Sequence, residues 1–360
     1  ARAPAAPYDD GVPPLRVRAR VLLAVVTVAG LGVACGSSTA TPDAADATAP
    51  TPVPSVPTVP SAPPVPSAPP DAAPDASRDA SLDAPEADAG VEEAASPDAA
   101  PPVLPCNGAS ELCGRRYDQV AYVTSHNAMS NSDALFIAPN QSRSVSRQLA
   151  AGVRGLMLDT YSFLGGTYLC HGSCALGATS LTTGLSDLRA FLDANPREVV
   201  TIIFESYVTP AATQAAFASA GLEPRLHAQP RSAPWPTLAE LIARDHRVVV
   251  FTDSGGGAYP WYHAVWSYAF ETPYAYKTAA DMRCVLNRGS VSNGLFILNH
   301  FLTNPLASES LARQVNFNPA FGARAAECQT AFGKLPNFVT VDFESIGDVV
   351  PVVRALNGLP

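Results

Sequence analysis

The sequence has no apolar run long enough to cross a bilayer, no basic patch and no CxxC pair. The apolar run at residues 21–33 is about 13 residues long, whereas a membrane-spanning helix needs roughly 20. The missing basic patch leaves nothing in the sequence that indicates nucleic-acid binding. Without a CxxC pair, and with cysteines scattered along the chain, a zinc site is a weaker interpretation than disulfide bonds.

The N-terminal segment has the pattern of an export signal. Basic residues precede the apolar run at 21–33, and small residues follow it up to Cys35. The small residues before Cys35 resemble a lipobox, although Gly32 stands where that pattern prefers leucine. We therefore expect residues 1–35 to direct export, with either a lipid anchor at Cys35 or ordinary secretion after cleavage elsewhere. A transmembrane helix is the alternative.

Residues 36–104 consist mainly of Pro, Ala, Ser, Thr, Val and Asp. This composition offers too little large apolar surface to offset the chain entropy lost on folding, so we expect a disordered, semi-extended linker. The segment holds eleven acidic residues and one base, Arg78, while the whole chain has a net charge of −9. The acidity of the chain thus belongs to the linker, and the remainder is close to neutral.

Six of the seven cysteines follow Cys35. In an exported chain, cysteines are expected to form disulfides. Many connectivities are possible for six cysteines, but the spacing along the chain favours three pairs: Cys106 with Cys113, Cys170 with Cys174, and Cys284 with Cys328.

After residue 105, short β-rich runs alternate with helical patterns, which is typical of repeated βα units around a parallel sheet. We expect strands at 119–125, 153–159, 199–204, 247–252, 294–298 and 338–343. We expect helices at 146–151, 185–194, 210–220, 237–243 and 348–356. These units predict an α/β fold over residues 105–360, namely an irregular (β/α)8-type TIM barrel. Residues 255–293 show no clear pattern, and a doubly wound open sheet is the alternative.

Polar residues stand at or just after the ends of the predicted strands, where barrel enzymes place their active sites: His126, Asn127, Asp159, Glu205, Asp253, His300 and Asp342. His126 and His171 could form a base and acid pair, because one imidazole can take a proton from an attacking hydroxyl while the other protonates the leaving oxygen. Asp342 is a candidate to accept a hydrogen bond from His126 and fix its tautomer. We interpret the remaining His227, His246 and His263 as structural.

Five segments carry a family resemblance, and they occur in a fixed order: residues 124–127, 152–159, 170–172, 195–205 and 336–342. Over residues 117–350 the chain resembles the X domain of phosphatidylinositol-specific phospholipase C, within the superfamily of PLC-like phosphodiesterases. The resemblance implies that the inositol 2-hydroxyl attacks phosphorus, diacylglycerol leaves and a cyclic phosphate forms. It also implies that His126 acts as general base or transition-state donor, and His171 as general acid.

Members of this superfamily balance the negative charge of the phosphate with calcium, or with an arginine two residues after the second-strand aspartate. Tyr161 occupies that arginine position here. The resemblance implies that Asn127, Asp159 and Glu205 hold Ca²⁺, and oxygen ligands of this kind suit a hard divalent cation. Met157 stands where the calcium-dependent members have a further acid, so the implied site is one ligand short.

The leading hypothesis is an exported, tethered and monomeric phosphodiesterase that acts on a phospholipid or a glycosylated phosphoinositide. It would reach the membrane surface through the lipid anchor or the substrate, and it would have no nucleic-acid partner. One alternative is a related phosphodiesterase for glycerophosphodiesters or sphingolipids. Another is a surface module that binds lipid or carbohydrate without turnover.

Other residues have weaker indications. Asn299 and His300 end a predicted strand and could contact a head group, while Arg154 is expected to point toward the helices. Aromatic residues crowd the region 235–276, where packing around the barrel is favoured over a rim that meets lipid or sugar.

Overall fold

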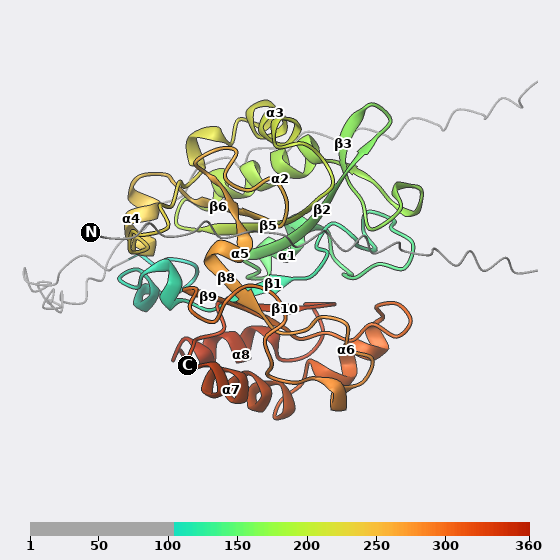
Figure 1. The fold of residues 1–360 in the computed structure, drawn as a ribbon, viewed down its shortest axis with the longest axis vertical. Coiled ribbons are helices and arrows are strands. Elements are labelled where there is room, and N and C mark those ends of the chain that lie inside the picture. Colours follow the sequence, from blue (N-terminus) through green and yellow to red (C-terminus); the bar gives the residue numbers. More distant parts are fainter. Residues whose placement is uncertain (1–103) are drawn as a thin grey trace, which may run out of the picture. The chain divides into compact units, whose positions relative to one another are not determined.

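The computed structural model describes residues 104–360, and the fold is shown in Figure 1. The predicted export signal at 1–35 and the predicted linker before Leu104 lie outside the described residues. No helix in the described part is long and apolar enough to span a membrane.

Eight parallel strands form one curled sheet with the order β7-β6-β5-β2-β1-β10-β9-β8. The first strand of the chain, β1, pairs in parallel with the last, β10, from Tyr122 opposite Phe338 to Ser125 opposite Val341. A first strand beside a last strand is the arrangement of a barrel, and it rules out the doubly wound alternative. The strands are β1 (Tyr122–Ser125), β2 (Gly155–Phe163), β5 (Val200–Ser206), β6 (Val248–Thr252), β7 (Tyr262–Ala264), β8 (Ala269–Glu271), β9 (Leu295–Asn299) and β10 (Phe338–Val341).

The barrel is irregular at one place. Within residues 104–360 no strand pairing joins β7 to β8, and the short helix α5 (Val265–Tyr268) stands between them in the chain. Elsewhere β3 (Gly166–Leu169) runs antiparallel to β2 and pairs with β4 (Thr179–Ser180). This hairpin returns the chain toward the end of β2, where the site lies.

All six predicted strands are present, because their apolar runs are buried on both faces of the sheet. In β6 the residues alternate between two cores: Val249 and Phe251 pack in one cluster, whereas Val248 and Val250 pack in the other. This alternation is the period of two that side chains follow along a strand. The sheet therefore separates an inner core from an outer core beneath the helices.

The five predicted helices are also present, and Figure 1 shows α2 and α3 on one side of the strands, with α7 and α8 on the other. Capping explains where they begin: Thr209 accepts a hydrogen bond from the third residue of its helix, and Thr237 forms a capping box with Glu240. The helices are α1 (Val145–Ala150), α2 (Leu181–Ala194), α3 (Pro210–Ala220), α4 (Leu238–Ala243), α6 (Glu309–Val315), α7 (Ala320–Phe332) and α8 (Val349–Leu356). Short 3-10 turns are η1 (Ser110–Leu112), η2 (Tyr117–Gln119), η3 (Cys174–Leu176), η4 (Glu223–Arg225) and η5 (Ala279–Asp281).

The three predicted disulfides are confirmed: Cys106–Cys113, Cys170–Cys174 and Cys284–Cys328. Every cysteine of residues 104–360 is therefore bonded, and the zinc interpretation is wrong for this part of the chain. The Cys284–Cys328 bond ties the segment between β8 and β9 to α7.

Candidate active site

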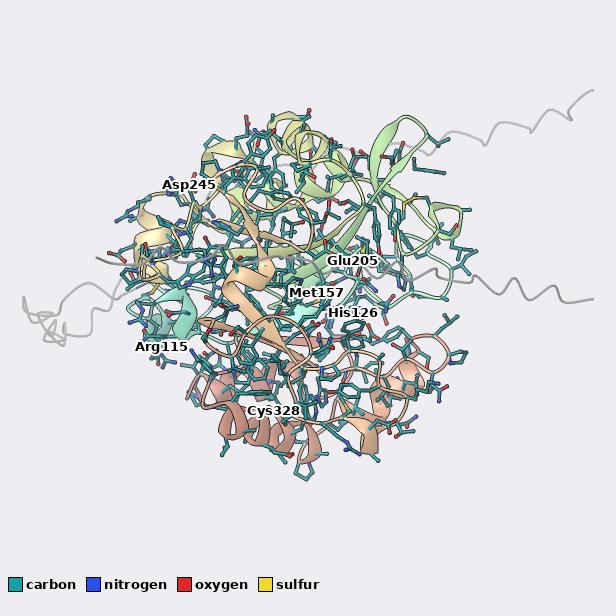
Figure 2. The ribbon with its side chains drawn as sticks, in the orientation of Figure 1. Arg115, His126, Met157, Glu205, Asp245 and Cys328 are labelled. Carbon is teal, nitrogen blue, oxygen red and sulfur yellow. A yellow bond between two sulfur atoms is a disulfide. The ribbon has the colours of Figure 1, made fainter. Side chains whose placement is uncertain are left out.

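A pocket opens at the carboxyl ends of the strands. His126, Asn127, Asp159, Glu205 and Asp253, which the sequence places at strand ends, all line it. Figure 2 shows the labelled His126 and Glu205 close together near the middle of the molecule, whereas Asp245 and Arg115 lie toward its edge. The barrel thus brings together residues from four strands.

His126 follows β1, and its ring is held on two sides. Its Nδ1 lies 2.9 Å from Oδ1 of Asp342, and the ring stacks on Phe301 with the centroids 3.9 Å apart. The Asp342 carboxylate is a hydrogen-bond acceptor, so Nδ1 of His126 carries the proton and Nε2 remains as the basic nitrogen. The expected contact between His126 and Asp342 is therefore present in the structure, in a geometry that suits a base.

Two amide side chains that the sequence analysis missed support this pair. Asn140 donates to Oδ1 of Asp342 at 3.0 Å. Gln141 donates to the backbone oxygens of His126 at 2.8 Å and of Val341 at 3.0 Å. Because these bonds run from the loop after β1 to the end of β10, they hold the two strand ends together. A polar pair inside a loop gives no periodic signal by which it could have been found.

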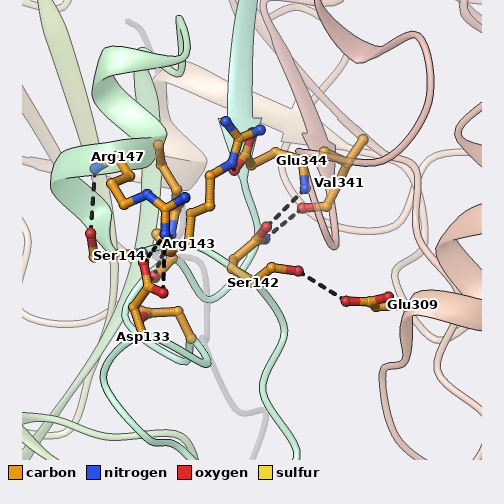
Figure 3. A network of polar contacts seen from close by, with 12 residues as sticks. Asp133, Ser142, Arg143, Ser144, Arg147, Glu309, Val341 and Glu344 are labelled. Atoms are coloured by element: carbon orange, nitrogen blue, oxygen red, sulfur yellow. Dashed lines mark hydrogen bonds and ion pairs between the residues drawn. The ribbon is translucent and has the colours of Figure 1, made fainter.

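Polar contacts fix the loop that carries these amides (Figure 3). Arg147 of α1 pairs with Asp133 at 2.8 Å. Arg143 pairs at 3.1 Å with Glu344, whose carboxyl is buried and whose pKa is raised by that burial. Ser142 donates to Glu309 of α6 at 3.2 Å. These contacts connect the loop after β1 to α1, to the segment after β10 and to α6.

His171 lies after the hairpin strand β3, next to the buried Cys170 of a disulfide. Its Nε2 lies 3.2 Å from Nδ2 of Asn127. Asn127 has a φ of +44°, in the left-handed region that asparagine tolerates better than most residues. His171 as a whole residue is exposed, but its ring is partly desolvated. This desolvation, together with repulsion from His126, lowers the pKa of His171. A lowered pKa makes the protonated ring a better proton donor.

Three carboxylates also line the pocket. Asp159 of β2 and Glu205 of β5 are register partners on adjacent strands, and Asp253 follows β6. Burial raises the pKa of Asp159 well above its ordinary value, and repulsion from Glu205 and Asp253 adds to the shift. Among residues 104–360 no side chain donates a hydrogen bond to the Asp159 carboxylate, whereas Tyr207 donates to Glu205. An uncompensated buried carboxylate of this kind is suited to a bound cation.

The donor set fits a hard divalent cation in its chemistry. Asn127, Asp159 and Glu205 offer amide and carboxylate oxygens, and all three line the same pocket. No three His, Cys, Asp or Glu side chains of the described residues lie close enough together to hold a metal by themselves. Met157 lines the pocket in phase with Asp159, as the period of the strand predicts, so it occupies the wall without offering an oxygen.

Two residues at the end of β9, Asn299 and the following His300, point in different directions. Asn299 lines the pocket, but the expectation for His300 is wrong: its ring is buried against Phe321 and lies outside the pocket. Arg154 pairs with Glu198 at 2.6 Å and lies over Phe191 of α2, as expected for a structural residue.

The irregular segment 255–293 contributes residues to the pocket, and two of them, Glu271 and Arg288, were not among the residues expected from the sequence. Trp266, Glu271, Tyr274 and Arg288 all line it. An arginine therefore does reach the site, although Tyr161 holds the position where the resemblance would place one. The expectation that the aromatic residues of this region only pack around the barrel is wrong for Trp266 and Tyr274 and correct for residues such as Tyr262, which is 1% exposed.

Known proteins share this domain. The chain is 32% identical over 282 residues to "PI-PLC X domain-containing protein 1" of Arthroderma benhamiae, covering 71% of this chain and 90% of that protein. It is 30% identical over 277 residues to a PI-PLC X domain-containing protein of Arabidopsis thaliana, covering 69% of this chain and 64% of that protein. An "Uncharacterized secreted protein" of Arthroderma benhamiae is 30% identical over 272 residues, covering 68% of this chain and 61% of that protein.

Among solved structures, the chain is similar to phosphatidylinositol-specific phospholipase C from Staphylococcus aureus, with a TM-score of 0.47 and 15% identity over 69% of this chain and 95% of that one. The family described as "PI-PLC X 1" matches residues 112–357, which is well over half of the chain. This match covers both histidines, the three carboxylates and Asp342, and it spans β1 through β10. The chain belongs to the PI-PLC X domain family.

Proposed function

We propose that this protein is a phosphodiesterase that cleaves phosphatidylinositol, or a glycosylated phosphoinositide, with a hydroxyl of the substrate as nucleophile. The observation that carries the proposal is the His126 and Asp342 pair at 2.9 Å, at the edge of a pocket that also holds Asn127. His171 contacts the side-chain amide of Asn127, the residue that directly follows His126 in the chain. Membership of the PI-PLC X domain family supports phosphodiester chemistry.

The geometry supports a two-step movement of protons. Nε2 of His126 takes the proton of the attacking inositol 2-hydroxyl, and the buried Asp342 stabilises the resulting imidazolium. The hydroxyl oxygen forms a bond to phosphorus, while the bond from phosphorus to the diacylglycerol oxygen breaks. His171 gives its proton to that leaving oxygen. The products are diacylglycerol and a cyclic inositol phosphate.

We further propose that Ca²⁺ takes part, with Asn127, Asp159 and Glu205 as the residues that would hold it. When bound, a divalent cation offsets negative charge on the phosphate oxygens. Burial, and in addition repulsion from Glu205 and Asp253, raises the pKa of Asp159, and a bound cation would offset both effects, which supports this assignment.

Loop tips next to the pocket support action at a lipid surface. Leu135 and Ile137 follow β1, and Leu164 stands at the turn after β2; they are 84%, 64% and 81% exposed. These turns lie beyond the same strand ends as the pocket. Exposed apolar side chains in the loops that follow these strands suit contact with acyl chains.

We propose that the protein works outside the cell as a monomer. Its three disulfides and a relative called a secreted protein support export. The proposed lipid anchor at Cys35 lies outside the described residues.

The test is an assay of the full chain on vesicles of phosphatidylinositol, with products identified by phosphorus NMR. A cyclic inositol phosphate from the wild type, and its loss in His126→Ala and His171→Ala, is the expected result. His246→Ala is the matched control, because this histidine is partly exposed and lies outside the pocket. Full activity in both test variants would refute the roles assigned to them. Activity that survives a calcium chelator would refute the metal assignment.

Two other outcomes would redirect the proposal. Cleavage of glycerophosphodiesters or sphingomyelin without cleavage of phosphatidylinositol would assign a different substrate to the same site. Saturable vesicle binding without any product, at millimolar calcium, would indicate a binding module that has lost turnover.

A further inference from the structure

The charges in the pocket are unbalanced. Asp159, Glu205, Asp253 and Glu271 line it, and among its lining residues Arg288 is the one that carries a fixed positive charge. A phosphodiester is an anion, so four carboxylates would repel it from this pocket. A positive group that faces the phosphate is therefore needed, whether or not a metal is also bound.

Arg288 is held in place by its neighbours, although it belongs to the irregular segment between β8 and β9. Its Nε donates to Oε1 of Glu271 at 2.5 Å, and Glu271 is only 2% exposed. Asn287 also donates to Oε1 of Glu271, at 2.8 Å, and Asn299 donates to Oε2, at 3.0 Å. Glu271 is thus fixed through both oxygens, and it anchors the guanidinium at its inner edge.

Two aromatic rings hold the plane of the same guanidinium. The central carbon of Arg288 lies 4.4 Å from the ring centroid of Trp266 and 4.7 Å from that of Tyr274. Both distances fall in the range of cation–π attraction, which is strongest for tryptophan. The ring contacts and the Nε bond together restrict the rotation that a free arginine side chain would have.

The outer edge of the guanidinium is left available. Within residues 104–360 the terminal amino groups, Nη1 and Nη2, make no hydrogen bond, and the Arg288 side chain is 41% exposed. A purely structural arginine usually directs these groups to carbonyl or carboxylate oxygens, as Arg154 does with Leu149 and Val153. The two terminal amino groups of a fixed guanidinium match the spacing of two phosphate oxygens.

We propose that Arg288 binds the phosphate of the ligand through Nη1 and Nη2, and that Glu271, Trp266 and Tyr274 position it. The inference rests on the proposed function, because it names the group that would receive the phosphate of that substrate. Arg288 would thereby bring the segment 255–293, whose secondary structure could not be assigned from the sequence, into contact with the ligand.

The test measures phosphate binding separately from turnover. The full chain, with a calcium chelator present, is titrated with inorganic phosphate and followed by calorimetry and by tryptophan fluorescence, since Trp266 lies against the guanidinium. Arg288→Met is expected to weaken phosphate binding about ten-fold or more, because charge-assisted hydrogen bonds are lost. Arg288→Lys keeps the charge but not the paired donors, so an intermediate affinity is expected.

Arg283→Met is the matched control: Arg283 is exposed, belongs to the same segment and does not line the pocket, so its loss should leave phosphate affinity unchanged. Near-ultraviolet circular dichroism checks that each variant is folded. If Arg288→Met misfolds, the comparison of Arg288→Lys with wild type decides the question. Equal affinities in wild type and the Arg288 variants, or no saturable binding by wild type, would overturn the inference.

Cleavage of phosphatidylinositol measured in parallel separates the two proposals. Phosphate binding that depends on Arg288, in a wild type without turnover, would sustain the inference while the proposed function fails. Turnover by the wild type with phosphate affinity unchanged in Arg288→Met would sustain the function while the inference fails.

Discussion

His300 predicts how the stability of the protein depends on pH. Its ring is 2% exposed, its Nε2 donates to the carbonyl of Val315 at 2.9 Å, and its Nδ1 accepts from Arg324 at 3.1 Å. A second proton on Nδ1 would face the N–H of a guanidinium. Burial, together with repulsion from Arg324, therefore lowers the pKa of His300 from 6.5 to about 3.

The sign and size follow from proton linkage. Below pH 6.5 the unfolded chain takes up a proton on His300, whereas the folded chain does not. The contribution of the neutral His300 to the free energy of unfolding is therefore fully present above pH 6.5 and is lost as the pH falls toward 3. At pH 5 the loss attributable to His300 is about 2 kcal/mol relative to pH 8. His300→Gln removes the titrating group, so the difference in unfolding free energy between pH 8 and pH 5 should shrink by about that amount.

The assay is urea unfolding at both pH values with the disulfides intact, followed by circular dichroism. The variant is expected to be less stable than wild type at pH 8, but with a flatter pH dependence. Val315→Ala is the control, because it removes apolar contacts beside the same ring without removing a titrating group and should cost the same at both pH values. An unchanged difference between pH 8 and pH 5 in His300→Gln would refute the reasoning.

Asp342→Asn should lower kcat on phosphatidylinositol about 10²-fold or more, and shift the pH–rate profile, because the base loses the carboxylate that fixes its tautomer; an unchanged profile would assign Asp342 a structural role. Gly155→Ala would place a Cβ 2.3 Å from Oγ1 of Thr124, so the free energy of unfolding should fall by about 1–3 kcal/mol and Tm should fall with it, whereas Gly294→Ala, at an open position, should change both little. Replacing both cysteines of Cys284–Cys328 with serine removes a cross-link between residues 44 positions apart, and it should lower the free energy of unfolding by about 4 kcal/mol, measured with urea. An unfolding midpoint equal to that of the wild type would show that the cross-link contributes nothing.

Much of the barrel could be predicted from the sequence because its long strands are buried on both faces. Residues 200–204 are all buried, and such a run leaves a continuous apolar signal. β7 and β8 are three residues long each, too short for any period to appear, so the segment between 255 and 293 stayed unassigned. Glu271 and Arg288 were missed for that reason, since their role depends on contacts that only the folded segment makes.

The candidate site was predictable where strand periodicity determined which way side chains point. Asp159 and Met157 share a phase on β2, and both line the pocket. His300 shows where the rule of polar strand ends fails. Asn299, the last residue of β9, points into the pocket together with Ile297, so the next residue points away from it. Applying the period to His300 would have removed it from the candidate set.

The pairing of the first strand with the last determines when, during folding, the site can form. His126 and Asp342 are 216 residues apart in the sequence, and they meet only when β10 docks beside β1. In a chain that is still being synthesised, or that is shortened before residue 338, His126 lacks its partner Asp342, and Asn140 lacks the carboxylate to which it donates. Any function that depends on this pair therefore requires that β10 has docked beside β1.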